Sequence, residues 1–282
     1  MPDLEEISYS REATVNAFRD YYRFLVNLYM DESEILEPPE GGWPTVSAEF
    51  GRLSGKSDEV IALLRSLPYI RQDCRNGALF PPQGSAHCYW ADWQSLADLG
   101  DVGVGVDSTD LRETLNAMTE GCLDPVPAHV VGLTYGDREN KNFLLDTKLG
   151  IVHWPESDGG GRHSANFDND PSFIEPVELW DELDGIVPEK EFEWRMESPA
   201  WAITDFFELL KKQFRELKWI PINAREVITF DIRPSPDGMI PMLRGIFRDH
   251  GWPSEQGGTY RKRECLEAVK AALEEHYPDF NV

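Results

Sequence analysis

Hydrophobic positions recur at helical spacing in the N-terminal part of the chain. Between residues 11 and 30 the apolar side chains lie three and four positions apart, which is the period of an amphipathic helix with one buried face. Ser10 precedes this run and is a favourable N-cap residue. The prolines and glycines of PPEGGWPT, residues 38–45, cannot continue a helix. We therefore predict a helix over residues 11–30.

Four further segments share this period, namely residues 57–67, 109–120, 201–218 and 259–276. Ser57 and Thr259 are candidate N-caps for the first and last of them, and Gly121 is a candidate C-cap for the second. Residues 69–108 follow no clear period, so we expect irregular structure there.

The period changes to that of β-strands after residue 127. Short runs rich in β-branched and aromatic residues lie at 129–135, 142–147, 151–154 and 226–232. Strands that are grouped, instead of alternating with helices, indicate an α+β fold. We predict a single compact α+β domain over residues 1–282. Its antiparallel sheet would contain the meander around 127–154 plus the strand 226–232, packed by several helices.

A long polar stretch interrupts the pattern between residues 155 and 200. It is rich in glycine, aspartate, glutamate and proline. A connection of this length inside a compact domain is usually functional or partly disordered. We expect a long acidic surface insertion within the domain.

The step Gly-Trp-Pro occurs twice, at Trp43 in PPEGGWPT and at Trp252 in DHGWPS. Proline moves the preceding residue out of helical geometry, and glycine allows a sharp turn. The flanking helices share no further period, so the two segments are not a repeat. We predict two chain corners, each anchored by an inward tryptophan. A paired role in ligand contact is the alternative.

Acidic residues outnumber basic residues by 51 to 27, which gives a net charge of −24. Such a surface repels phosphate backbones and anionic lipids, so we expect neither nucleic acid nor a membrane as a partner. A basic partner protein or a small-molecule ligand fits better. The four cysteines lack zinc-site spacing, and the acidic N-terminus is unlike a signal peptide. We expect a soluble protein in the cytoplasm or also the nucleus.

Candidate catalytic residues are few. His153 ends a strand, and Glu156 follows three residues later, an arrangement that suits acid–base chemistry. The sequence offers no GxSxG motif and no identifiable Cys/His pairing to supply a nucleophile. A structural role for His153 is the simpler interpretation.

Aromatic residues suggest a binding site. The candidates for contacting an apolar or sugar-like ligand are Trp43, Tyr89, Trp90, Trp93 and Trp154. The same residues are equally typical of a protein core.

The sequence gives only weak indications of a metal site or a phosphate site. Asp168 and Asp170 form a DxD pair that has oxygen ligands for a divalent metal, but short acidic pairs are common in so acidic a chain. The glycines of residues 100–105 are spaced GxxGxG, which is not a dinucleotide fingerprint. We predict no metal and no cofactor.

Several stretches resemble a widespread group of uncharacterised fungal proteins. They are GGWP at 41–44, LPYIR at 67–71, LLDTKLGIVHW at 144–154, DFFELLKKQFRELKWIP at 205–221 and RKRECLEAVKAALEEHYPD at 261–279. Residues 125–215 also resemble, in part, the SUKH superfamily of fungal cell-wall-synthesis regulator-like domains. In that likeness Asp146 and Gly150 would hold the acidic strand end and the turn glycine, and Phe206 and Phe207 the helix motif. SUKH domains are mainly protein-binding modules, so the resemblance implies interaction rather than catalysis.

Two functional hypotheses follow. The first is a soluble, intracellular, SUKH-like interaction or regulatory protein whose acidic surface binds a partner protein. The alternative is an enzyme, for instance of fungal specialised metabolism, with an aromatic-lined pocket covered by the 155–200 loop. A small-molecule sensor without turnover would use the same pocket.

Overall fold

The computed structural model describes residues 4–72, 80–101, 108–136, 140–155, 170–174, 188, 191, 194–195, 198–229, 236–254 and 259–280. Helices and several antiparallel sheets form one compact body, which confirms the predicted α+β class. No helix in the described ranges is long and apolar enough to cross a bilayer.

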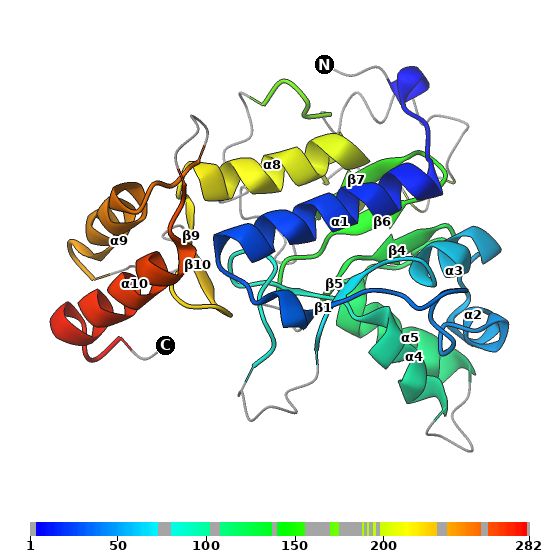
Figure 1. The fold of residues 1–282 in the computed structure, drawn as a ribbon. Helices are drawn as coiled ribbons and strands as arrows, with labels where there is room; N and C mark the ends of the chain where they lie inside the picture. Colours follow the sequence, from blue (N-terminus) through cyan, green and yellow to red (C-terminus); the bar gives the residue numbers. More distant parts are fainter. Residues whose placement is uncertain are drawn as a thin grey trace.

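Two long helices cover the inner face of the main sheet. Helix α1 spans Arg11–Leu28 and helix α8 spans Ile203–Arg215, and they pack side by side (Figure 1). The hydroxyl of Ser10 accepts the N–H of Ala13 at 3.3 Å, so the predicted N-cap is confirmed. Their shared core is aromatic, and it includes Phe18 packed on Phe207 with ring centroids 4.9 Å apart.

The main sheet has four antiparallel strands in the order β4-β6-β7-β8. They span Val130–Gly132, Leu144–Asp146, Ile151–His153 and Ala200–Ala202. The predicted hairpin between β6 and β7 is confirmed, and Gly150 adopts φ +76° in its turn. The outermost strand, β8, lies at the start of a segment for which the sequence predicts only helix.

Strand β10, Val227–Thr229, lies outside this sheet. It pairs with β9, Trp219–Pro221, as a separate two-stranded hairpin that directly follows α8. The predicted strand therefore exists, but its partner is the nearest strand in the sequence instead of the meander. Its backbone also contacts the loop before β3, because the N–H of His87 donates to Val227 O at 3.1 Å.

The region between α1 and the main sheet is more regular than its sequence suggests. It contains η2 Glu32–Glu34, β1 Ile35–Leu36, α2 Ala48–Ser54, α3 Asp58–Leu64, β2 Tyr69–Ile70, β3 Tyr89–Trp90, α4 Trp93–Asp101 and α5 Ser108–Thr119. Outside this region, η1 Leu4–Glu6 precedes α1, and β5 Thr134–Tyr135 follows β4 and pairs with β3. The expectation of irregular structure over 69–108 fails at α4. Its start is fixed by Asp92, whose carboxylate accepts the N–H groups of Gln94 and Ser95.

Two antiparallel helices close the chain. Helix α9 spans Met239–Asp249, and helix α10 spans Lys262–His276 (Figure 1). Helix α10 begins three residues later than predicted, and Thr259 does not cap it. Its N-cap position is Arg261, which makes no side-chain capping bond. The start of α10 is held instead by tertiary bonds from Lys262.

Both Gly-Trp-Pro corners are anchored as predicted. The indole N–H of Trp43 donates to Leu67 O at 2.8 Å, and that of Trp252 donates to Phe214 O at 3.0 Å. Each tryptophan is only 8% exposed. Gly42 and Gly251, which precede them, have φ values of +81° and +92°, a conformation that favours glycine.

Candidate functional site

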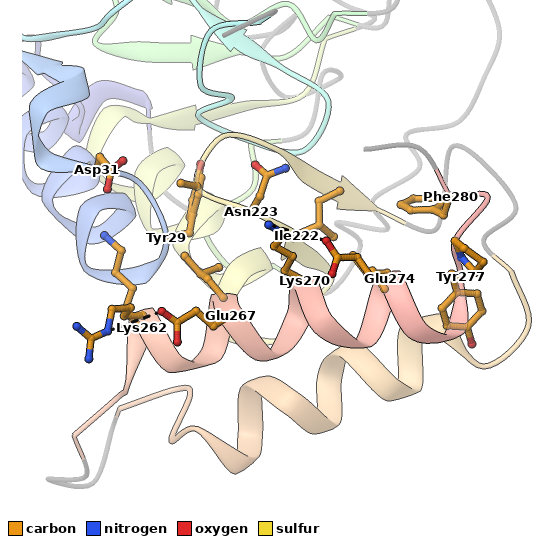
Figure 2. A pocket seen from close by; sticks show the side chains of 15 residues that line it. Tyr29, Asp31, Ile222, Asn223, Lys262, Glu267, Lys270, Glu274, Tyr277 and Phe280 are labelled. Atoms are coloured by element: carbon orange, nitrogen blue, oxygen red, sulfur yellow. Dashed lines mark ion pairs between the residues drawn. The ribbon is translucent and has the colours of Figure 1, made fainter. Parts of the chain in front are cut away.

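The candidate site is an open groove along helix α10, with a volume of about 940 Å³ (Figure 2). One wall is α10 itself. The other is formed by the end of α1 and the turn between β9 and β10, and the C-terminal residues close one end. We call it the α10 groove. It is lined by Tyr29, Asp31, Ile222, Asn223, Ala224, Lys262, Arg263, Leu266, Glu267, Lys270, Leu273, Glu274, Tyr277, Pro278 and Phe280.

The helical wall combines an apolar floor with a charged rim. Leu266 and Leu273 contribute the floor, where Leu273 is buried and Leu266 is half-buried. Along the rim, Lys270 lies 3.8 Å from Glu274 in an i,i+4 ion pair. Because opposite charges alternate on this helix, the rim itself has little net charge.

The opposite wall is held in place by its own hydrogen bonds. Asn223 Oδ1 accepts the N–H groups of Arg225 at 2.7 Å and Glu226 at 2.9 Å, which closes the turn between β9 and β10. The Arg225 guanidinium forms an ion pair with Glu34, a residue that is 7% exposed. This wall is therefore positioned before any ligand arrives.

Both ends of α10 are tied to other elements. Lys262 Nζ donates to Val26 O at 2.7 Å and to Met30 O at 2.5 Å, where it satisfies carbonyls at the C-terminal end of α1. Burial lowers the pKa of Lys262, and the nearby charge of Asp31 opposes this effect. At the other end, Tyr277 donates its hydroxyl to Asp237 O at 2.9 Å. These bonds fix both ends of α10 relative to neighbouring parts of the chain, so the width of the groove is set by the fold.

A second group of polar residues lies on the outer face of the main sheet and is buried. Arg195 Nη2 lies 2.9 Å from Asp146 Oδ2, and Arg195 Nη1 lies 3.0 Å from His153 Nε2. Glu191 Oε2 accepts from the same guanidinium at 3.3 Å, and the ring of Trp194 packs against it at 4.4 Å. We call Asp146, His153, Glu191 and Arg195 the Arg195 network.

Protonation states in the network follow from geometry. Arginine has only donors, so His153 Nε2 is an acceptor and its ring is neutral. Burial, and then the charge of Arg195, lower the pKa of His153 to about 3. For Asp146, burial alone would raise the pKa, but bonding to His129 and the charge of Arg195 hold it well below its usual value. His153 thus acts as a neutral hydrogen-bond acceptor in the core.

Several residues of the 155–200 stretch are buried, although the sequence predicts a surface insertion there. Trp194 and Ile174 are 5% and 2% exposed, and they pack against the outer face of the sheet. Glu191 and Arg195 are buried as well. Ile174, Glu191, Trp194 and Arg195 therefore form a cover over the sheet, because its outer face presents Leu144 and other apolar side chains that need burial.

The aromatic candidates lie in the core. Trp90 and Trp93 are at most 1% exposed, and the indole N–H of Trp93 donates to Gly132 O at 3.0 Å. Trp154 packs on Phe143 with centroids 4.9 Å apart. Tyr89 is half-buried beside them. Together with Trp43, these rings pack against protein atoms and do not line the α10 groove.

Of the acidic candidates, the structure describes only Asp170. Asp170 Oδ1 accepts from the N–H of Ser172 at 3.0 Å, a local turn contact. Glu156 and Asp168 lie outside the described residues. Within the ranges that are described, no group of three or more histidine, cysteine or acidic side chains is placed to hold a metal ion.

Comparison of the chain with family models, with curated proteins and with solved structures gave no match. The likeness to fungal proteins and to SUKH domains thus stays a prediction. The α10 groove was not foreseen from the sequence. Its signal was Leu266, a half-buried apolar residue on α10 beside the buried stripe of Cys265, Val269 and Leu273.

Proposed function

We propose that this chain is a soluble interaction or regulatory protein, which binds a partner protein in the α10 groove. The observation that carries this proposal is the groove itself, an open apolar channel whose walls are fixed by Asn223, Lys262 and Tyr277. Specific interfaces combine such an apolar centre with a polar rim.

The distribution of titratable groups supports binding over catalysis. The Arg195 network contains the one candidate catalytic residue that is described, His153, and its side chain has no exposed surface. A general base needs to reach a substrate within hydrogen-bond distance. In the arrangement described here, His153 bonds to Arg195 and packs on Trp194 instead.

The charge of the chain favours a basic partner. A net charge of −24 attracts cationic proteins over long range and raises the association rate at low salt. The implied likeness to SUKH domains supports the same class of function, in the cytoplasm or nucleus of a fungal cell.

Capture of proteins from a fungal cell extract tests the proposal when it is combined with variants of the groove. Ala224→Trp places a large side chain on the wall of the groove, whereas Ala271→Trp adds the same side chain at an exposed position of α10 outside it. We expect a protein that is retained by the wild type and by Ala271→Trp and lost with Ala224→Trp. Retention of the same proteins by all three, or of none, contradicts the proposal.

A further inference from the structure

Many backbone polar groups in the walls of the α10 groove are bonded internally. One wall is an α-helix of 15 residues. On the other wall, the N–H of Ile222 donates to Glu226 O at 2.9 Å, and Asn223 Oδ1 accepts two more N–H groups of the same turn. An extended peptide would bury its own N–H and C=O groups against such walls, at a cost in free energy. A helix satisfies these groups by itself.

The shape of the groove suits a helix laid along α10. Lining residues occur from Lys262 to Tyr277, so the groove follows the full length of α10, about 22 Å. Leu266 and Leu273 are seven positions apart and so lie on the same side of the helix. An apolar stripe of this kind is the surface into which amphipathic helices dock their own apolar face.

Acidic and basic side chains both flank the apolar floor: Asp31, Glu267 and Glu274 are balanced by Lys262, Arg263 and Lys270. Among the described residues that line the wall opposite α10, Asp31 alone is charged; it is exposed, and its charge also acts on Lys262. On α10, Glu267 is exposed and its partner Arg263 lies 4.0 Å away, a loose contact. By contrast, Lys262 is already bonded to two carbonyls of α1. Among the cations of the rim it is therefore the least free to pair with a ligand.

We propose that the occupant of the α10 groove is an amphipathic α-helix of a partner protein, with its apolar face on Leu266 and Leu273 and lysine or arginine residues along its flanks. This inference rests on the proposed function and narrows it to one mode of recognition. The acidic residue Asp31 contacts a basic flank of the helix, and the net charge of −24 steers the partner toward the protein.

Three synthetic peptides test this inference, each about 14 residues long to match α10. The first combines leucine and lysine so that all leucines share one helical face, the second has the same composition in scrambled order, and the third has glutamate in place of lysine. Fluorescence anisotropy measures their affinity for the wild type, Ala224→Trp and Ala271→Trp. Circular dichroism confirms that the variants are folded and reports the helicity of the bound peptide.

We expect the first peptide to become helical and to bind the wild type and Ala271→Trp alike. Binding of this peptide to Ala224→Trp, and of the other two peptides to the wild type, should be at least about tenfold weaker, a difference of about 1.4 kcal/mol. Asp31→Asn should weaken binding of the first peptide by less than Ala224→Trp does, and it should reduce the salt dependence of that binding. Equal binding of the scrambled peptide, or equal binding to Ala224→Trp, would overturn the inference, because attraction to the acidic surface alone would explain it.

The peptide experiment can fail while the capture experiment that tests the proposed function succeeds, so the two proposals can be judged separately. If a protein from the extract is lost with Ala224→Trp while no peptide binds, the helix inference is wrong and partner binding in the groove stands. If laurate, a free fatty acid, binds in the groove and the first peptide does not, the helix inference is also wrong, in favour of a small apolar ligand. If neither capture nor peptide binding depends on the groove, both proposals fail.

Discussion

Arg195 and Asp146 form an ion pair of 2.9 Å between side chains that are 1% and 0% exposed. Arg195 comes from the segment that covers the outer face of the sheet, and Asp146 ends strand β6. The pair therefore joins two parts of the chain that are 49 residues apart in sequence, from Asp146 to Arg195. A buried charge without its partner is far more costly than the loss of an exposed pair.

Replacement of Arg195 by methionine should strongly destabilise the protein. It removes the buried guanidinium beside the Asp146 carboxylate and leaves only His129, 3.6 Å away, as an ionisable partner, so we expect a loss of about 3–5 kcal/mol in the free energy of unfolding. Chemical denaturation measures this loss. The double variant Arg195→Met/Asp146→Asn removes both charges and keeps an acceptor for the hairpin N–H groups of Lys148 and Leu149. It should recover part of the stability, and a single variant that loses under about 1 kcal/mol would contradict the network.

Stability should fall as the pH is lowered from 6.5 toward 3, partly because of His153. Its folded pKa of about 3 lies below the unfolded value of 6.5, so in this window the unfolded state binds the extra proton. Asp146 contributes a further loss only below about pH 4, the unfolded range of an aspartate.

His153→Gln isolates the histidine, because glutamine has an acceptor for Arg195 and does not titrate. The stability advantage of the wild type over this variant should shrink by up to about 3 kcal/mol between pH 6.5 and pH 4. Denaturation at a series of pH values measures it. A difference that is constant with pH would show that His153 is not held neutral in the fold.

The two tryptophan corners should behave as structural anchors. Trp43→Ala and Trp252→Ala each remove a buried ring and a hydrogen bond, so we expect a loss of about 3–5 kcal/mol for either. The phenylalanine variants keep most of the packing and should cost about 1 kcal/mol through the lost N–H bond. Thermal or chemical unfolding tests both. A Trp43→Ala variant with wild-type stability that had lost only a binding activity would favour the ligand-contact alternative.

Lys262→Met should loosen the attachment of α10 to α1. Charge-assisted hydrogen bonds to two backbone carbonyls are lost, at about 1.5–3 kcal/mol. Lys270→Met is the matched control, because its ion pair with Glu274 is exposed and should contribute under about 0.5 kcal/mol. Unfolding measurements on both variants compare the two lysines directly, and equal effects would argue against Lys262 as a tertiary anchor.

Local signals predicted much of the secondary structure. Ser10 and Ser57 both accept the expected capping bonds, and Gly150 turns the hairpin of the main sheet as its position suggested. These features depend on residues within a few positions, so the sequence displays them directly. Helix α4 was missed because its capping residue, Asp92, lies within an otherwise irregular stretch.

The candidate site was less predictable. Its walls come from the residues after α1, the turn after β9 and α10, and nothing near Leu266 in the sequence indicates that it lines the same groove as Ile222. His153 stood out as a possible catalyst, since a histidine at a strand end suits one. Its environment depends on Arg195, 42 residues later, which the sequence places in a stretch that resembles surface loop.

The sequence by itself determined the α+β class, the positions of α1, α3, α5 and the main hairpin, the anchoring of both Gly-Trp-Pro corners and the large negative charge. Periodicity, capping and composition are local or additive properties of a chain. Only the tertiary structure decided that β10 pairs with β9, that Arg195 pairs with Asp146 beneath the sheet cover, and that α10 forms one wall of a groove. Each of these depends on burial and on charge compensation between distant segments, which are properties of the packed molecule.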